Sequence, residues 1–149
     1  MNAVMPLSDD EANFKRPVPL SIQGPVIVKD AGVKGRGCFA TAAIKKGQLI
    51  ERCPVVIVPI TQKELIDQSL LYHYYYAWTP DEEGVAISLG YGSIYNHSYK
   101  PNAVFDRVFA GGYIDYVALR DIAIGEEITV NYNGEPDDMD PLPYFEVKE

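Results

Sequence analysis

Three short segments, far apart in the chain, collect residue types that could bind a ligand or do chemistry. Residues 35–39 (GRGCF) hold two glycines, which allow positive φ and a close approach of the backbone to a ligand. Residues 95–102 (YNHSYKPN) place Asn, His, Ser and Asn beside an apolar, aromatic run; if buried, these side chains must hydrogen-bond to each other, to backbone or to a ligand. Residues 125–132 (GEEITVNY) predict a turn and then a strand that carries the Tyr132 phenol near its end.

Each segment alone also fits a structural role: a glycine turn between strands, a polar loop that ties strands together, and a packed core tyrosine. The glycine segment lacks the GxGxxG spacing and the following helix that a dinucleotide site needs. A zinc site is disfavoured, and no metal is expected, because the two cysteines and two histidines form no CxxC or HxxxH pair. Spacing leaves open a nucleophilic pair of Cys38 or Cys53 with His97, although nothing else supports it.

The composition is that of an ordinary globular protein of one domain. The chain has 149 residues, of which 47% are hydrophobic and 23% charged, and this argues against disorder throughout. No run reaches 18 uncharged apolar residues, so a transmembrane helix is not expected, and the N-terminus lacks the layout of a secretory signal. Two cysteines read as free thiols in a reducing compartment. We therefore predict a cytoplasmic location, with the nucleus and secretion into a host left open.

The net charge of −8 is concentrated near the C-terminus, since residues 133–149 hold six acids and one base. An acidic chain disfavours direct binding of a nucleic acid backbone, and a basic protein or peptide is its natural complement. We expect three regions: a flexible, proline-containing leader over residues 1–24, a folded domain over residues 25–132, and an acidic segment over residues 133–149.

The elements that must position the three segments are mostly short strands. One helix is predicted, with Thr61 as its cap, Glu64 at the capping-box position and Leu65, Leu70 and Leu71 as its apolar stripe. The fully apolar run 55–58 between two prolines predicts a buried strand, and Gly111–Gly112 predicts the turn of a hairpin. The pattern indicates a mostly-β compact domain with strands over residues 26–28, 39–44, 48–52, 55–58, 72–78, 85–89, 103–109, 113–119 and 128–132.

Taken in order, GRGCF, YNHSYKPN and GEEITVNY resemble the SET domain of protein lysine methyltransferases, most closely the compact SET proteins of viruses and bacteria. The resemblance covers residues 25–132. It implies a fold of several small curled β-sheets with one short helix. It also implies a C-terminal pseudoknot, in which the strand ending at Tyr132 passes under the loop around Asn96 and brings the three segments together.

The same resemblance implies roles for individual residues. Tyr132 matches the catalytic tyrosine, and Phe105 falls where the family limits how many methyl groups fit, so we predict di- or trimethylation of a lysine. The S-adenosylmethionine pocket would be lined by Gly35, Arg36, Gly37, Phe39, Asn96 and His97. The lysine channel would be lined by Phe105, Tyr95, Tyr91 and Tyr144.

Two departures from the family pattern bear on the lysine channel. Cys53 stands where the family commonly has a channel tyrosine, and Tyr74, Tyr75, Tyr76 or Tyr91 are the candidates to replace it. The cysteine-rich zinc segment after the core is missing, and its covering role could fall to Tyr144 or Phe145. Compact relatives sometimes complete the site by dimerising, so a homodimer is compatible with this chain.

The leading hypothesis is an S-adenosylmethionine-dependent methyltransferase acting on a lysine of a basic protein segment, in a histone, a histone-like protein or another target such as a ribosomal protein. The alternative is a SET-like module that binds a protein and transfers nothing. The changed Cys53 position favours this alternative, whereas the intact Asn96, His97 and Tyr132 argue against it.

Overall fold

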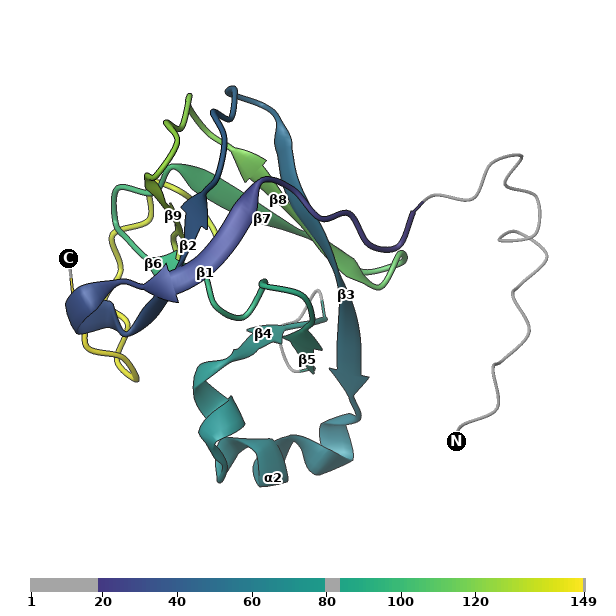
Figure 1. Cartoon of the computed structure of the whole chain (residues 1–149). Helices are drawn as coiled ribbons and strands as arrows, with labels where there is room; N and C mark the ends of the chain where they lie inside the picture. The colour runs from purple at the N-terminus through teal and green to yellow at the C-terminus, as the bar shows by residue number, and fades with distance from the viewer. Residues whose placement is uncertain (1–18, 80–83, 149) are drawn as a thin grey trace.

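The computed structural model describes residues 19–79 and 84–148, which form two small curled sheets, and short helical segments connect strands within each sheet (Figure 1). One sheet has the strand order β1-β2-β9-β6, and the other has the order β4-β5-β3-β8-β7. The strands are β1 (Val26–Asp30), β2 (Arg36–Ala40), β3 (Leu49–Val58), β4 (Tyr75–Ala77), β5 (Val85–Ser88), β6 (Asn96–His97), β7 (Ala103–Val108), β8 (Tyr113–Ala118) and β9 (Glu127–Val130). The helical segments are η1 (Gly32–Lys34), η2 (Ile60–Gln62), α2 (Lys63–Asp67) and η3 (Leu70–His73).

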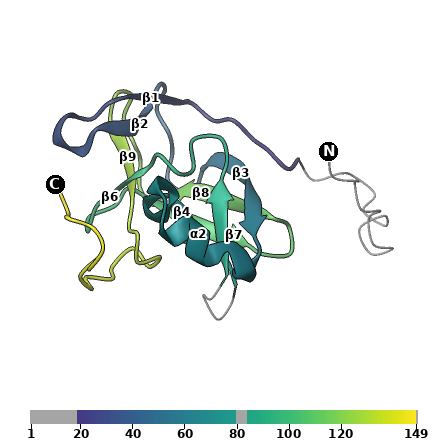
Figure 2. The ribbon, with the colours of Figure 1, turned by 90° about the horizontal axis from the view of Figure 1, so that it is seen from below.

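The first sheet brings the three chemistry-bearing segments side by side. β2, which begins inside the glycine segment, pairs antiparallel with β9, and Cys38 lies opposite Ile128. On its other edge β9 pairs in parallel with the two-residue strand β6, and Asn96 lies opposite Thr129. Both views of the ribbon show β9 flanked by β2 and β6 (Figures 1 and 2). The predicted convergence of the segments is therefore confirmed, whereas the threading that would make a pseudoknot stays a prediction.

The second sheet is built on one long strand where the sequence predicts two. The predicted strands 48–52 and 55–58 form, from Leu49 onward, the single continuous strand β3, which crosses Pro54. Proline has no N–H to donate to a ladder. Pro54 is tolerated because β3 changes partner there, pairing with β8 up to Pro54 and with β5 from Val55 onward. The β7–β8 hairpin is formed as predicted, with Gly112 at a φ of 69° in its turn.

The predicted helix is shorter than expected, and its apolar stripe is exposed. Thr61 lies inside η2 and caps nothing, and α2 spans five residues. The Ser69 hydroxyl donates to the Ile66 carbonyl and accepts from the Leu71 N–H, so its local bonds start a new turn, η3. Leu65 and Leu70 are 67% and 74% exposed.

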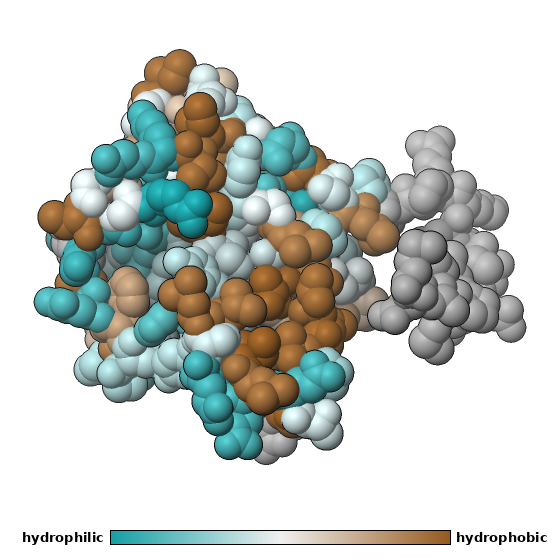
Figure 3. All heavy atoms as spheres, turned by 60° about the horizontal axis from the view of Figure 1, so that its bottom comes forward, coloured by the Kyte–Doolittle hydropathy of each residue, from teal (hydrophilic) through white to brown (hydrophobic). Residues whose placement is uncertain are grey.

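The apolar end of β3 is exposed as well. Val56 and Ile57 are half-exposed, so the prediction that residues 55–58 are a buried strand was wrong for these two. β3 has lost β8 as its neighbour at this point and pairs only with β5. Figure 3 shows a broad hydrophobic surface on the side of the molecule that carries α2.

The core lies between the sheets and includes the side chain of the buried acid Glu51. Its largest fully buried side chains include Tyr95, Tyr116, Ile114 and Ile128.

At the end of the predicted leader, Ile22 exchanges backbone hydrogen bonds with Arg52 of β3. The rest of that leader, residues 1–18, lies outside the described residues. Among those described, no helix is long and apolar enough to cross a membrane.

Candidate active site

A large cavity of about 970 Å³ opens beside the first sheet. Its wall is formed by the end of β1, η1, the start of β2, β6 and residues of the C-terminal segment. Among the residues that line it are Gly35, Arg36, Asn96, His97 and Phe145. Gly35 has a φ of 82°, a conformation that favours glycine, so the sequence can bend the loop around this space. We call this space the large cavity.

A second space of about 320 Å³, the aromatic cavity, lies against β4 and β7. It shares Tyr132, Tyr74 and Tyr144 with the large cavity, together with His73 and Ser93. The two cavities therefore meet at Tyr132, and the large one has Asn96, His97 and charged side chains such as Arg36 in its wall, while the second is walled mainly by aromatic rings. Its aromatic lining consists of Tyr72, His73, Tyr74, Tyr75, Tyr76, Tyr95, Phe105, Tyr132 and Tyr144.

Tyr132 is held by both its backbone and its hydroxyl. Its N–H donates to His97 Nδ1 at 3.0 Å, and its hydroxyl donates to the Tyr95 carbonyl oxygen at 2.8 Å. The first bond puts the proton of a neutral His97 ring on Nε2. Burial, helped by Tyr144, raises the pKa of the Tyr132 phenol. The phenol therefore stays protonated near neutral pH and acts as a fixed hydrogen-bonding group at the junction.

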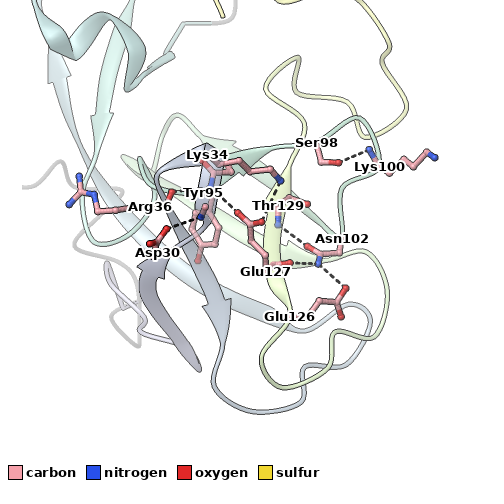
Figure 4. Close-up of polar contacts among 12 residues, drawn as sticks. Asp30, Lys34, Arg36, Tyr95, Ser98, Lys100, Asn102, Glu126, Glu127 and Thr129 are labelled. Carbon is pink, nitrogen blue, oxygen red and sulfur yellow. Dashed lines mark hydrogen bonds and ion pairs between the residues drawn. The ribbon is translucent and has the colours of Figure 1, made fainter. Parts of the chain in front are cut away.

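Asn96 is fixed by the glycine segment and by β9. Its Nδ2 donates to the Arg36 carbonyl oxygen at 2.9 Å and to Glu127 Oε1 at 2.8 Å. The Glu127 carboxylate also contacts Lys34 Nζ at 3.4 Å, as Figure 4 shows. Lys34 and Glu127 are residues to which the sequence assigned no role, although both lie in or beside the quoted motifs.

Asn102 ties the polar loop to β9. Its Nδ2 donates to the Glu127 carbonyl oxygen at 2.7 Å, and its Oδ1 accepts from the Thr129 N–H at 2.9 Å (Figure 4). The loop therefore does knit strands together, as its structural reading predicted, and it also presents Asn96 and His97 at the large cavity. Residues 95–102 therefore have both predicted roles: Asn102 ties strands together, and Asn96 and His97 face the large cavity.

Glu51 is a buried acid that the sequence reading missed. It accepts hydrogen bonds from the Tyr95 hydroxyl at 2.9 Å and from the Tyr91 N–H at 3.2 Å. Burial and then this carboxylate raise the pKa of the neighbouring Cys53 thiol to about 12. The available signal was an acid inside the largely apolar run 49–58, since an acid there is buried only if it has partners.

The predicted cofactor residues divide into two groups. Gly35, Arg36, Asn96 and His97 line the large cavity, while Gly37 and Phe39 do not. A Cβ at Gly37 would lie 2.6 Å from Glu127 Oε1 and 2.9 Å from Asn96 Nδ2, so this glycine leaves room for that pair. The Phe39 ring lies 4.4 Å below the Lys29 ammonium group.

The predicted channel residues divide in the same way. Tyr95, Phe105 and Tyr144 line the aromatic cavity, and Tyr132 closes it. Tyr91 is not among the lining residues and packs against the core instead.

Cys53 is buried in β3 and does not line this space, whereas three of the proposed replacements, Tyr74, Tyr75 and Tyr76, do. The Tyr76 hydroxyl donates to the Gly92 carbonyl oxygen at 2.7 Å, and its ring lies 5.0 Å from that of Phe105.

The C-terminal segment lies over the junction. The Phe145 ring is 5.5 Å from that of Tyr132, and the Tyr144 ring is 6.2 Å from that of Tyr72. The segment is anchored at Asp140, whose carbonyl oxygen accepts from the Tyr99 hydroxyl and from Asn133 Nδ2. Across the described part of the chain, no three His, Cys, Asp or Glu side chains are grouped to hold a metal ion.

Comparison with known proteins agrees with this geometry. Residues 35–133 match the family described as the SET domain. A histone-lysine N-methyltransferase of Schizosaccharomyces pombe, specific for H3 lysine 37, is 35% identical over 112 residues, which are 74% of this chain and 75% of the relative. The variant-silencing SET domain-containing protein of Plasmodium falciparum is 33% identical over 138 residues, but the match spans only 5% of that protein.

Solved structures share the fold. A Plasmodium falciparum protein assigned as a histone methyltransferase superposes with a TM-score of 0.58 at 27% identity, covering 74% of this chain and 95% of that one. The Polycomb Repressive Complex 2 of Chaetomium thermophilum, bound to S-adenosylmethionine, gives a TM-score of 0.61 at 19% identity over 74% of this chain and 15% of that one. With its three motifs joined in one sheet and its two cavities meeting at a tyrosine, this chain belongs to the SET-domain family of protein lysine methyltransferases.

Proposed function

We propose that the protein transfers methyl groups from S-adenosylmethionine to the side chain of a lysine in a basic protein segment. The observation that carries this proposal is the meeting of two chemically different cavities at the Tyr132 phenol. A donor and an acceptor that enter from opposite sides would be brought together at one oriented hydroxyl group. Such positioning can supply several kcal/mol of rate acceleration without a metal.

The large cavity fits the cofactor in size and in the chemistry of its wall. Its volume of about 970 Å³ is at the upper end of ordinary ligand sites. Asn96, the backbone around Gly35 and Arg36, and His97 are the groups that would hold the polar parts of the cofactor, and the Phe145 ring offers an apolar surface. When bound, S-adenosylmethionine supplies an electrophilic methyl group on a sulfonium sulfur.

The aromatic cavity suits a lysine that must lose its proton. With an ordinary pKa of ~10.4, only about one lysine in 2,500 is neutral at pH 7. Rings such as Tyr76 and Phe105 offer a wall that disfavours the ammonium form. At the inner end, the protonated Tyr132 hydroxyl and the Tyr95 carbonyl oxygen are fixed hydrogen-bonding atoms that can orient the neutral amine.

Phe105 supports more than one methyl transfer to the same lysine. It is buried in the wall of the aromatic cavity, where its ring packs edge-on against Tyr76. A phenylalanine leaves room that a tyrosine hydroxyl and its bound water would fill. We therefore propose di- or trimethyllysine as the product, and mass spectrometry that finds only monomethyllysine contradicts this part of the proposal.

The charge of the chain supports a basic substrate. The C-terminal segment, which is acidic overall, contributes Asn133 and Tyr144 to the aromatic cavity and both Glu146 and Lys148 to the large one. Attraction of this kind steers a basic segment toward the site and is screened by salt. The Schizosaccharomyces pombe relative, whose name gives histone H3 as its target, favours a histone tail or a histone-like segment as the first substrate to test.

The direct test is incubation of the protein with radiolabelled S-adenosylmethionine and basic proteins, followed by location of the labelled residue. We expect label on lysine, and transfer that weakens as salt rises. Calorimetry with S-adenosylmethionine alone separates the two halves of the proposal. Binding without transfer to any basic protein would favour a protein-binding module, and no binding would overturn the proposal.

A further inference from the structure

The Asn96 side chain shows only one kind of polar atom to the large cavity. A primary amide has two N–H donors on Nδ2 and one acceptor oxygen. Both donors of Asn96 are engaged, by the Arg36 carbonyl oxygen at 2.9 Å and by Glu127 Oε1 at 2.8 Å. Both partner atoms are oxygens that can only accept. If the amide were flipped, Asn96 Oδ1 would face both of these oxygens and neither hydrogen bond could form. The Oδ1 atom is therefore left to meet a ligand, and it can meet only a donor.

The carboxylate that fixes this orientation is itself held. Glu127 is on β9, and its side chain pairs with Lys34 Nζ at 3.4 Å, with both side chains at least four-fifths buried. Its carbonyl oxygen accepts from Asn102, which locks the strand beneath it (Figure 4). Gly37 leaves the space that the carboxylate and the Asn96 amide share, since a Cβ there would overlap both.

From this geometry we infer that Glu127 is a positioning residue, which sets the Asn96 amide so that Oδ1 receives the ammonium group of the cofactor's amino-acid part. The inference rests on the proposed function and adds to it the residue that orients Asn96. The large cavity is lined by Asn96 and not by Glu127, so Glu127 acts through Asn96 and not by touching the ligand.

The preceding residue provides a matched control. Glu126 is partly buried and also accepts from an asparagine, Asn102, but it pairs with Arg120 and with the Ala123 N–H. Neither Arg120 nor Ala123 lines either cavity. Replacing either glutamate by glutamine removes one negative charge and one ion pair, but of the two only Glu127 contacts Asn96.

The experiment is calorimetry on the whole chain with two probes. S-adenosylhomocysteine carries the amino-acid part with its ammonium group, and 5′-methylthioadenosine lacks it. In Glu127→Gln the new carboxamide can face either Lys34 or Asn96 with its oxygen, but not both. We expect the Kd for S-adenosylhomocysteine to rise about tenfold, as for the loss of a charge-assisted bond, while the Kd for 5′-methylthioadenosine stays within twofold.

Two further readouts separate positioning from general damage. In Glu126→Gln both Kd values should stay within twofold of the unchanged protein. In Glu127→Gln the KM for S-adenosylmethionine should rise while kcat stays within twofold. An unchanged Kd for S-adenosylhomocysteine in Glu127→Gln, or an equal loss for both probes, overturns the inference and leaves the proposed function intact. An unchanged protein that binds neither probe overturns the proposed function and the inference with it.

Discussion

The two cavities that meet at Tyr132 are built by different means. The large cavity is built from the ends of β1 and β2, from η1 and from β6, and two polar side chains in its wall, Asn96 and His97, have their orientation fixed by hydrogen bonds. The aromatic cavity is made from rings that β4, β7 and the C-terminal segment bring together, with hydroxyls such as that of Tyr76 tied to backbone carbonyls.

The two cavities, called below the polar side and the aromatic side of the site, should therefore respond differently to substitutions. A site defined by directed hydrogen bonds loses affinity when one donor or acceptor is turned. A site defined by ring packing changes shape when one atom is added, and so changes which substrates and products fit. We expect substitutions on the polar side to change cofactor binding, those on the aromatic side to change product, and those at Tyr132 to change turnover.

The largest effect is expected where the two sides meet. In Tyr132→Phe the ring is kept and the hydroxyl that donates to the Tyr95 carbonyl is lost. Turnover should fall at least about 100-fold because the reacting amine is no longer oriented, while the Kd for S-adenosylhomocysteine stays within a few-fold.

Tyr99→Phe is the matched control, since the Tyr99 hydroxyl also donates to a backbone carbonyl and its ring also packs on His97. Tyr99 lines neither cavity. Near-normal turnover in Tyr132→Phe removes the phenol from the mechanism, and any loss in Tyr99→Phe measures how much of the effect comes from anchoring the C-terminal segment.

Gly37→Ala should break the polar side alone. The added methyl group would overlap the Glu127 carboxylate and the Asn96 amide, and one of them has to move. We expect the Kd for S-adenosylhomocysteine to rise about tenfold, as for one lost charge-assisted bond. Calorimetry measures this, and methyllysine products from saturating cofactor should keep their original distribution. A changed distribution would show that the two sides are not separable.

Phe105→Tyr should change the aromatic side alone. A hydroxyl added at this buried position needs a partner or a water, and either one takes up space beside the amine. We expect the ratio of di- and trimethyllysine to monomethyllysine to fall about fivefold, as measured by mass spectrometry, with cofactor affinity unchanged. Phe109→Tyr, which adds the same atom beside Trp78 and outside both cavities, should leave the ratio unchanged.

The same contrast explains what could be predicted from the sequence. The residues of the polar side lie within short sequence motifs. A glycine needed for a close backbone approach, or an asparagine with two fixed partners, can be replaced by few other residues. Gly35, Asn96 and Tyr132 could therefore be found by type and order. Their convergence came from the family resemblance, since the parallel pairing of β6 with β9 joins residues more than 30 positions apart.

The aromatic side could be predicted only in part. Tyr91 and Tyr76 are both tyrosines near apolar runs, and only the folded chain shows that Tyr76 lines the cavity while Tyr91 is drawn to Glu51 through its N–H. The prediction of one helix with a buried apolar stripe was wrong for a related reason. Leu65 and Leu70 follow a helical pattern, but α2 ends before Ser69, and both leucines are exposed.

The smallest effect is expected from pH acting on Tyr132. Burial raises the pKa of this phenol above the ordinary value of ~10, so it keeps its proton between pH 7 and pH 10. The substrate lysine loses its proton in the same range. We therefore expect kcat/KM to rise about tenfold per pH unit between pH 7 and pH 9, with less than a twofold loss from Tyr132 by pH 10.

The stability of the chain allows this measurement. A phenol with a higher pKa in the folded than in the unfolded chain stabilises the fold fully below pH 10, and that stability is lost as the pH rises through the folded pKa. Burial raises the pKa values of Tyr76, Tyr95 and Tyr116 as well, so the whole aromatic side should stay folded through the window. Circular dichroism checks the fold at each pH. A rate that falls above pH 8.5 in folded protein would mean that the phenol at the junction ionises, and that the aromatic side reaches water there.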